Sequence, residues 1–392
     1  MRTTRTSVYP TMTFTIINSE LCNKIQMVNK VVNSKNVLPI LDNIIFSVAD
    51  GILTLKASDS ENTLQTQLTP SESSGEASFA VNAKNITEAV KNIQQDMEVT
   101  FEYDESSASV KVSYFSGLFS LPADCADEFP VTPQLNDNPI SFSITDNILL
   151  GNIGRTLFAT AQDELRPVMN GIFFDLTADC LAVVASDGHH LIRNKVLTIM
   201  AEKVGETAKT GSFILPKRPA AVLKAILSKT GEQVTISFNE RNIEIRTENF
   251  TLTSRLIEGR YPNYNSVIPL NNQNIMKVNR LDMLSALKRV SPFSNESSNL
   301  IRMHVENNVL QLDAQDYDFS KTAVEKVPCE YDGQPITIGF KGVSVMELLQ
   351  NMNSLEVEAQ MADPSRAALF LPVDQPEGED ILMLQMPMLI ND

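Results

Sequence analysis

The residues most suggestive of catalysis lie together near the middle of the sequence. The stretch Ala185–Leu191 reads Ala-Ser-Asp-Gly-His-His-Leu and holds two of the three histidines of the chain. Ser186, Asp187 and His189 are the residue types of a serine hydrolase, in which a histidine activates a hydroxyl group. Their closeness in sequence argues against triad geometry, and Ser186 lacks the Gly-x-Ser-x-Gly turn that exposes such a nucleophile. The third histidine, His304, lies in a predicted strand and has no such neighbours. Taken together, these observations favour a protein that is not an enzyme.

Asp187 also ends a phrase that occurs three times. The pattern Leu-x-(Leu or Val)-x-Ala-x-Asp is found at 53–59, 181–187 and 310–316. The period is about 128 residues, so each copy is long enough to be a domain with its own core. No histidine follows Asp59 or Asp316, which favours a structural role for these aspartates at a turn or strand end.

Other landmarks keep the same period and predict where the domains divide. Phe79, Phe213 and Ile338 each begin a short apolar stretch before a helical pattern, and Pro-rich loops follow the first two copies. We predict an extension outside the fold over 1–11, which ends before a second methionine, Met12. Three domains are predicted over 12–134, 135–268 and 269–392.

Hydrophobic periodicity predicts the same order of elements in each copy: strand, helix, strands, helix, strands. Asn18 or Ser19 is expected to cap the first helix and Asn82 the second. Helices are predicted over 19–32, 82–93, 146–160, 216–228, 280–291 and 343–352. Strands are predicted over 13–17, 44–48, 52–57, 79–81, 99–103, 109–113, 117–121, 140–144, 172–176, 181–186, 213–215, 234–238, 243–247, 250–255, 300–306 and 309–314.

Composition excludes several classes of protein. The 392 residues are 43% hydrophobic, and no apolar run is long enough to span a membrane. Residues 1–11 lack the apolar centre of a secretion signal. The four cysteines, Cys22, Cys125, Cys180 and Cys329, are widely spaced, which fits reduced thiols in the cytoplasm. No phosphate loop, metal-ligand spacing or nucleotide fingerprint is present, so we expect no cofactor, metal or catalytic residues.

Charge is divided unevenly along the chain. The net charge is −16, yet the six predicted helices with their entries sum to +9, which leaves −25 for the strands and loops. The stretch Pro216–Lys229 alone carries +4. Solvated helix faces often carry lysines, but the contrast with such an acidic remainder favours a basic surface made by helices. Such a surface would bind phosphates without reading base sequence.

From Met12 onward the chain resembles the beta subunit of bacterial DNA polymerase III, the DNA sliding clamp. The resemblance is carried, in order, by Leu38–Asn43, Ala49–Gly51, Asn170–Gly171, Ser186–Leu191, Phe213–Lys217, Leu256–Tyr264 and Met386–Met388. It implies an α+β fold of three clamp domains, each with two helices packed on antiparallel sheets. It also implies a ring formed by a head-to-tail homodimer, which encircles duplex DNA and gives a polymerase processivity.

The resemblance implies three sets of functional residues. The expected DNA contacts are Lys35, Lys84, Lys91, Arg155, Lys217, Arg218, Lys224 and Arg289. A cleft for short peptides of the polymerase catalytic subunit, the clamp loader and repair proteins would use Met169, Ser186, Gly188, His189, His190, Leu191, Pro262, Val267, Leu384, Met386, Pro387 and Met388. The dimer contacts would be Phe119 and Leu121 of the first copy with Pro292 and Phe293 of the third, unless these four are core residues.

The chain departs from the family pattern in the cleft. His190, Ser266 and Leu389 stand where the family usually has arginine, and Asn391 and Asp392 extend the usual end. Two function classes stay open: a cytoplasmic DNA tether, or a scaffold of the same triple repeat that binds only proteins.

Overall fold

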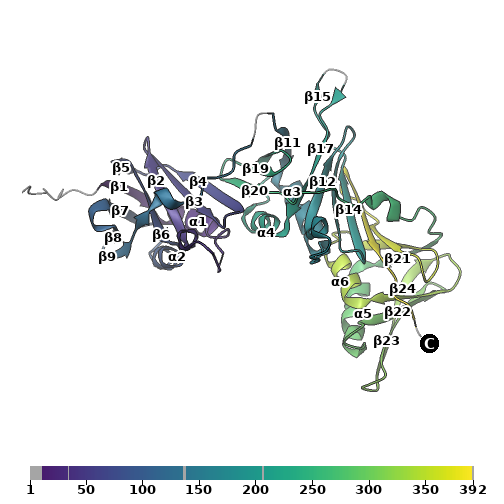
Figure 1. Cartoon of the computed structure of the whole chain (residues 1–392). Coiled ribbons are helices and arrows are strands. Elements are labelled where there is room, and N and C mark those ends of the chain that lie inside the picture. Colours follow the sequence, from purple (N-terminus) through teal and green to yellow (C-terminus); the bar gives the residue numbers. More distant parts are fainter. Residues whose placement is uncertain (1–10, 34, 136–137, 205–206, 391–392) are drawn as a thin grey trace, which may run out of the picture. The chain divides into compact units, whose positions relative to one another are not determined.

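The computed structural model describes residues 11–33, 35–135, 138–204 and 207–390 (Figure 1). The predicted extension therefore lies outside the described residues except for Thr11, whose backbone N–H donates to the Tyr103 carbonyl oxygen at 2.8 Å. The first strand, β1 (Met12–Ile17), begins at the second methionine, as the onset of alternation predicts.

The chain forms two compact units, one made of residues up to 146 with 221–256, the other of 147–220 with 257–392. The second repeat thus contributes to both units, and the predicted domain boundaries stay a prediction. α3 (Asp146–Thr156) and α4 (Lys217–Ile226) each have residues in both units.

The first unit contains two antiparallel sheets with α1 (Asn18–Val28) and α2 (Ala83–Lys91). One sheet has the order β5 (Glu72–Ser74), β1, β7 (Glu98–Asp104), β8 (Ser109–Tyr114), β9 (Gly117–Pro122). The other has the order β10 (Asp124–Cys125), β6 (Ala77–Asn82), β2 (Asn43–Ala49), β3 (Ile52–Ser58), β4 (Asn62–Leu68), β20 (Thr251–Arg255), β19 (Asn242–Arg246), β18 (Gln233–Phe238), β11 (Ile140–Thr145).

The second unit is built on one long antiparallel sheet with α5 (Arg280–Val290) and α6 (Gly342–Gln350). The strand order is β17 (Gly211–Pro216), β12 (Gly171–Leu176), β13 (Leu181–Ser186), β14 (His190–Val196), β28 (Glu379–Gln385), β27 (Ala368–Pro372), β26 (Glu356–Met361), β21 (Asn274–Asn279), β24 (Lys321–Tyr331), β23 (Val309–Asp316), β22 (Leu300–Glu306), β25 (Ile336–Lys341). A separate short pair is formed by β15 (Lys203–Val204) and β16 (Thr207–Ala208).

The repeats are joined through their sheets. β4 of the first repeat pairs with β20 of the second, and β14 of the second pairs with β28 of the third. Neither β4 nor β14 was predicted, because Asn62–Leu68 and His190–Val196 are rich in polar residues. Both are nevertheless largely buried, since strands lie on both sides of them.

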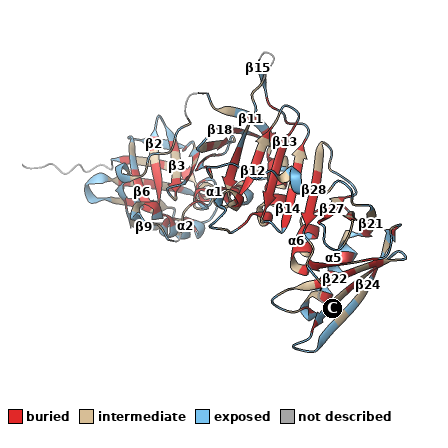
Figure 2. Cartoon of the chain, turned by 45° about the vertical axis from the view of Figure 1, so that its right-hand side comes forward, coloured by how far each residue is buried: buried red, intermediate tan, exposed pale blue. Residues whose placement is uncertain are grey.

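Apolar side chains form most of the buried core, and the buried segments are coloured red along the strands and helices in Figure 2. In the first unit Phe46 stacks on Phe79 at 5.3 Å between ring centroids, and Phe14 stacks on Phe101 at 4.7 Å. In the second unit β22 alternates between buried and half-buried residues along its length, with α5 and α6 packed on the buried side. The predicted mixture of helices and antiparallel sheets is confirmed. Within the described residues, no helix is both long and apolar enough to cross a membrane.

The predicted cap of the first helix is wrong, whereas that of the second is confirmed. Asn82 accepts the backbone N–H of Asn85 at 3.1 Å. Asn18, by contrast, is buried, and its side-chain N–H groups donate to the carbonyl oxygens of Val90 and Ile93, both at 3.0 Å. Asn18 therefore satisfies the carbonyls at the end of α2 instead of the N–H groups at the start of its own helix. The first helix also ends at Val28 rather than near residue 32.

Candidate functional site

The three repeated aspartates make the same turn at the ends of β3, β13 and β23. Asp59 accepts the backbone N–H groups of residues 61 and 62, at 3.1 and 2.8 Å. Asp187 accepts those of His189 and His190, at 2.8 and 2.9 Å. Asp316 accepts that of residue 318 at 3.1 Å and, more weakly, that of residue 319. A carboxylate that accepts two backbone N–H groups fixes a turn, so the predicted structural role of Asp187 is confirmed.

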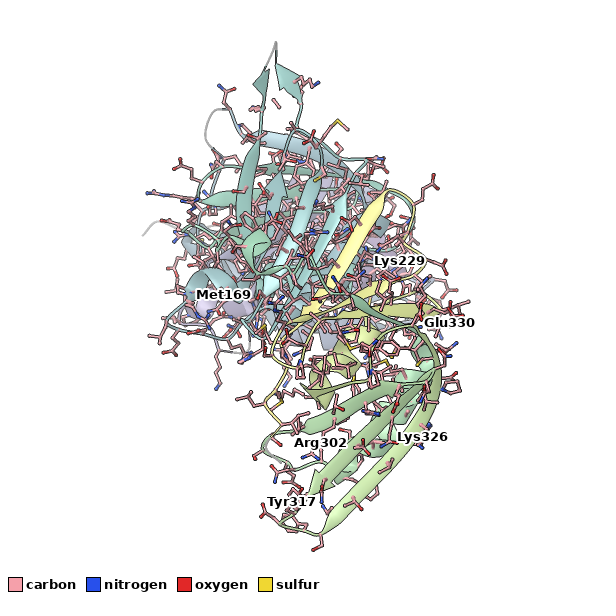
Figure 3. All side chains as sticks on the ribbon, turned by 90° about the vertical axis from the view of Figure 1, so that its right-hand side faces the viewer. Met169, Lys229, Arg302, Tyr317, Lys326 and Glu330 are labelled. Carbon is pink, nitrogen blue, oxygen red and sulfur yellow. The ribbon has the colours of Figure 1, made fainter. Side chains whose placement is uncertain are left out.

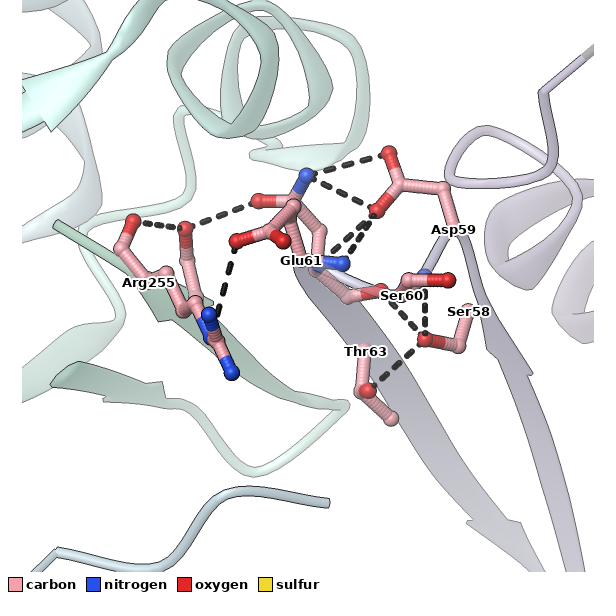
Figure 4. A network of polar contacts seen from close by, with 8 residues as sticks. Ser58, Asp59, Ser60, Glu61, Thr63 and Arg255 are labelled. Atoms are coloured by element: carbon pink, nitrogen blue, oxygen red, sulfur yellow. Dashed lines mark hydrogen bonds and ion pairs between the residues drawn. The ribbon is translucent and has the colours of Figure 1, made fainter. Parts of the chain in front are cut away.

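A serine supports this turn in the first two repeats, and Figure 4 shows the turn of the first repeat. The Ser58 hydroxyl donates to the Asn62 carbonyl oxygen at 2.8 Å, and the Ser186 hydroxyl donates to the His190 carbonyl oxygen at 2.9 Å. Gly188 has φ +92, a left-handed conformation that glycine adopts without strain. The Ser186 hydroxyl is therefore directed at a backbone carbonyl oxygen and not at an imidazole, so it does not form a hydrolase pair.

His190 is the buried member of the histidine pair, whereas His189 is exposed. Its ring stacks on Phe158 of the short helix η4 (Leu157–Ala159) at 5.7 Å, and Nδ1 lies 3.3 Å from an Asp187 carboxylate oxygen. Burial lowers the pKa of His190. Asp187 and Glu347 act in the opposite direction, and His189 and Lys341 add to the lowering. Burial therefore favours the neutral form of this imidazole.

Acidification is expected to destabilise the protein through His190. Because its folded pKa lies below the unfolded value of 6.5, the unfolded state binds the proton first. Stability is then complete above the unfolded pKa and falls as pH drops from there towards the folded pKa. The His190→Gln variant should lose less thermal stability than the wild type between pH 7.5 and 5.5. His189→Gln is the matched control, and an equal pH slope in all three proteins would contradict the assignment.

The structure brings part of the predicted peptide cleft together. In the pairing of β14 with β28, Leu191 lies opposite Leu384, and the Met386 N–H donates to the His189 carbonyl oxygen at 2.8 Å. Leu191 and Leu384 belong to one apolar cluster that also contains Tyr261. Residues almost 200 apart in sequence therefore belong to one apolar cluster, in which Leu191 and Leu384 are both buried, and the binding of a peptide there stays a prediction.

The remaining predicted cleft residues differ in exposure. Met169, in the short helix η5 (Pro167–Asn170), is buried, while Pro262 and Val267 are exposed. Tyr261 was not singled out from the sequence, although it stacks on Phe173 at 4.7 Å and anchors this loop. Burial raises the pKa of Tyr261 to about 12. Its place in the stretch Leu256–Tyr264 was a signal for it.

Most of the predicted DNA contacts have side chains that reach solvent. Lys84 and Lys91 are exposed on α2, Lys35 is exposed after α1, and Lys224 is exposed on α4. At the start of α4, Lys217 and Arg218 are half-buried, and burial lowers the pKa of Lys217 while Asp187 opposes this. Arg289 of α5 is exposed but forms an ion pair with Glu325.

Arg155 differs from the expectation. It lies on α3 as predicted, but its side chain is buried and forms an ion pair with Glu379. Asn194 donates to the same carboxylate at 2.6 Å, so the charge is compensated inside the unit. A guanidinium held in this way is not presented to a phosphate, and we leave Arg155 out of the proposed DNA contacts.

Lys24 on α1 was counted in the helix charge but not singled out. Its ammonium group donates to the Asn249 side-chain oxygen at 3.0 Å, which ties α1 to the turn between β19 and β20. Burial lowers the pKa of Lys24, and Glu232 opposes this change. The position of Lys24 on a basic helix was the available signal, but its partner lies 225 residues away.

The four candidate dimer residues lie at the surfaces of their own units. Phe119 and Leu121 are half-buried on β9, the edge strand of its sheet. Pro292 and Phe293 are exposed in the short helix η7 (Ser291–Phe293) that follows α5. None of the four is a fully buried core residue, which favours an interface over the alternative of four core positions.

Comparison with known proteins covers all three repeats. The chain matches the models of the DNA polymerase III beta subunit N-terminal domain at residues 12–133, central domain at 143–263 and C-terminal domain at 265–389. It is 27% identical over 374 residues to the beta sliding clamp of Haemophilus influenzae, covering 95% of this chain and 99% of that protein. The beta sliding clamp of Pseudomonas aeruginosa is 27% identical over 377 residues, 96% of this chain and 100% of its own length.

Solved structures agree over the same length. The crystal structure of the DNA polymerase III subunit beta from Pseudomonas aeruginosa superposes with a TM-score of 0.89 at 26% identity, covering 96% of this chain and 100% of that one. The sliding clamp from Bartonella birtlesii bound to griselimycin gives a TM-score of 0.86 at 26% identity, covering 97% and 100%. Among the described residues, no group of three or more histidine, cysteine, aspartate or glutamate side chains is placed to hold a metal ion.

Proposed function

This chain belongs to the DNA polymerase III beta subunit family, and we propose that it is a DNA sliding clamp that closes as a head-to-tail homodimer around duplex DNA. In this role it tethers the replicative polymerase and other DNA-processing proteins and has no catalytic residues of its own. The observation that carries the proposal is the match of all three consecutive family domains, in the family's order, from residue 12 to residue 389.

The distribution of charge supports this function. The net charge of −16 disfavours DNA binding by the surface as a whole, but the exposed lysines of α2 and α4 offer local cations. Phosphate contacts of this kind give no sequence preference and weaken with salt. A ring that must slide needs contacts of this type, because a base-specific contact would stop it.

Topology provides the decisive test. The purified protein, loaded by a clamp loader onto nicked circular DNA, should remain bound through gel filtration at high salt and should leave once the circle is cut to a linear form. A scaffold that binds only proteins would show no dependence on whether the DNA is circular. Release at the same rate from circular and linear DNA would contradict the sliding-clamp function.

Reversing the charge at the start of α4 should weaken DNA contact without creating sequence preference. Lys217→Glu with Arg218→Glu changes the local charge by four units in a helix that carries three of the proposed DNA contacts. Removing about two phosphate contacts should reduce the steepness of log affinity against log salt by about 2. The measurement is a salt titration of equilibrium binding to duplexes of different sequence. Lys326→Glu with Lys321→Glu, on β24, is the matched control.

We further propose that the partners are bound through short linear peptides at the surface formed by Met386–Met388, beside the buried Leu191 and Leu384. These partners would be the polymerase catalytic subunit, the clamp loader and repair proteins. Apolar residues with a few polar neighbours suit such peptides, and methionines adapt to different side chains. The cytoplasm, where bacterial chromosomes are replicated, is the proposed location.

A further inference from the structure

The centre of β28, the strand that leads into the proposed peptide segment, carries little information about its register. β28 lies between β14 and β27 in the long sheet, and Figure 3 shows the side chains of this sheet with its last strands in yellow. Its centre is a run of buried apolar residues, Ile381–Leu384. Ile381 and Met383 belong to one apolar cluster, and Leu382 and Leu384 belong to another. A shift of one residue would therefore still place apolar side chains on both faces.

The matching strand of the second repeat is different. β20 pairs with β4 as β28 pairs with β14, but β20 contains polar residues within its run. The buried Ser254 hydroxyl donates to the Asn62 side-chain oxygen at 2.8 Å across this pairing, a contact that exists in one register only. The register of β28 has to be set outside its centre. It matters because a one-residue shift moves the residues that follow by about 3.3 Å and exchanges their faces.

Polar residues at the start of β28 supply what its centre lacks. Glu379 forms the ion pair with Arg155 of α3 and accepts a hydrogen bond from Asn194 at 2.6 Å. Asp380 accepts one from Arg193 of β14 at 2.8 Å. Because Glu379 and Asp380 are consecutive, their side chains lie on opposite faces of the strand. Each face of β28 therefore has its own ion pair with an arginine of the second repeat.

Either one-residue shift breaks one of these pairs. In a forward shift each residue takes the place of the one before it, and Ile381 comes to face Arg193. In a backward shift each residue takes the place of the one after it, and Gly378 comes to face the buried Arg155. A buried charge that is left without its partner is strongly destabilising. Only the observed register pairs both arginines with carboxylates.

The other end of the segment favours the same register. The Met386 N–H donates to the His189 carbonyl oxygen at 2.8 Å, and the Met388 N–H donates to the Gly339 carbonyl oxygen at 2.7 Å. Pro387, between them, has no N–H to donate. A shift in either direction would put Pro387 in one of these two places and lose a hydrogen bond. Both ends therefore discriminate between registers, whereas the apolar centre does not.

We infer that Glu379 and Asp380, through Arg155 and Arg193, are positioning residues that hold the peptide segment Met386–Met388 in register. The inference rests on the proposed peptide site and gives a role in it to residues at the opposite end of β28. Arg155, which the sequence placed among the DNA contacts, would thus act on partner binding instead. Because a partner binds only chains in the correct register, its apparent affinity falls in proportion to the fraction of such chains.

Removing Arg155 alone should cause the backward shift. In Arg155→Met, the observed register leaves the Glu379 carboxylate covered by protein and without a cation. The backward shift moves this carboxylate to Arg193 and loses only the hydrogen bond that Pro387 cannot donate. The short peptide has a glutamine near one end and leucine and phenylalanine near the other. In fluorescence anisotropy it should bind the variant roughly tenfold more weakly, as expected if about one chain in ten keeps the register.

Disulfide trapping reports the register itself. In the observed pairing Leu191 lies opposite Leu384, so Leu191→Cys with Leu384→Cys should form a disulfide in an otherwise wild-type chain. After the backward shift Met383 lies opposite Leu191, so Leu191→Cys with Met383→Cys should form one when Arg155→Met is also present. Without Arg155→Met these two side chains lie on opposite faces of the sheet and should stay unlinked.

Arg155→Met with Glu379→Met should reverse both effects. With no carboxylate at position 379, the backward shift offers Arg193 no partner, and the two apolar side chains can pack in the observed register. Peptide affinity and the disulfide pattern should return to those of the wild type. Arg155→Gln is a milder variant with the same expected results if Arg155→Met does not fold. Asp363→Asn, which removes a surface ion pair of the same repeat, is the control and should bind peptide normally.

The inference would be overturned by unchanged peptide binding in the folded Arg155 variants, or by weaker binding with only the wild-type disulfide. Absence of recovery in the variant that also carries Glu379→Met would overturn it as well. Failure of the short peptide to bind the wild type would instead refute the proposed peptide site. Disulfide trapping, which uses no peptide, would then still decide whether the two ion pairs set the register of β28.

Discussion

Replacing Phe293 with aspartate is expected to yield a folded monomer of about 43.4 kDa, half the mass of the wild-type dimer. Phe293 is 40% exposed in η7, so the rest of its side chain is already covered by its own chain. Burying the exposed part of Phe293 in an interface contributes about 1 kcal/mol to the free energy of dimer formation. An unpaired aspartate carboxylate buried at the same place costs several kcal/mol more.

Head-to-tail closure makes the effect large. A ring of two chains has two identical interfaces, so one substitution acts twice. Each ~1.4 kcal/mol is a factor of ten in the dissociation constant, and the combined penalty should weaken the dimer at least ~1,000-fold. Multi-angle light scattering at several concentrations measures the mass. Leu270→Asp, which places the same carboxylate on an exposed loop position, is the control and should remain dimeric. An unchanged dimer in the Phe293 variant would remove η7 from the proposed interface.

The repeated turn could be predicted from the sequence because its causes are local. A strand ending in aspartate needs only its own next two or three N–H groups to form the bend, and the phrase recurs with a constant period. Asp59, Asp187 and Asp316 therefore all act as expected. The cap at Asn82 is local in the same way, since its acceptor and donor are three residues apart.

The failures come from partners far away in sequence. Arg155 looks like one more cation on a helix until Glu379, 224 residues later, is placed beside it. Asn18 looks like a helix cap until the end of α2 presents two unsatisfied carbonyls to it. β14 has several polar residues and was not predicted as a strand, because its pairing with the distant β28 cannot be read from its own sequence. In each case the residue or strand has a partner in another element far away in sequence, and hydrophobic periodicity does not identify such a partner.

Pro328 lies within β24, a strand that was not predicted from the sequence. A proline normally argues against a strand because it cannot donate to a neighbour. In β24, residues 321–328 pair on one side with β23, whereas β21 pairs only with residues 329–331 on the other. Pro328 pairs with Val309 on the β23 side. Its missing N–H is therefore tolerated at a place where one edge of the strand is open.

Replacing Met386 and Met388 with alanine is expected to remove peptide binding and leave the dimer intact. Met386 is 40% exposed and Met388 is half-buried, so both side chains have surface that a peptide would cover. If the two together lose about 2–4 kcal/mol of apolar burial, affinity should fall roughly 30- to 1,000-fold. Anisotropy with a labelled short peptide measures this loss.

The fold should tolerate the change because the segment is held through its backbone. The Met386 N–H donates to His189 and the Met388 N–H to Gly339, and alanine keeps both contacts. The double variant should therefore keep the wild-type dimer mass and remain on circular DNA. Met200→Ala, at another exposed methionine, is the matched control and should bind peptide normally. If the Met386 and Met388 variant instead lost its dimer or its retention on DNA, the C-terminal segment would be a structural part of the third repeat. Its assignment to the peptide site would then be wrong.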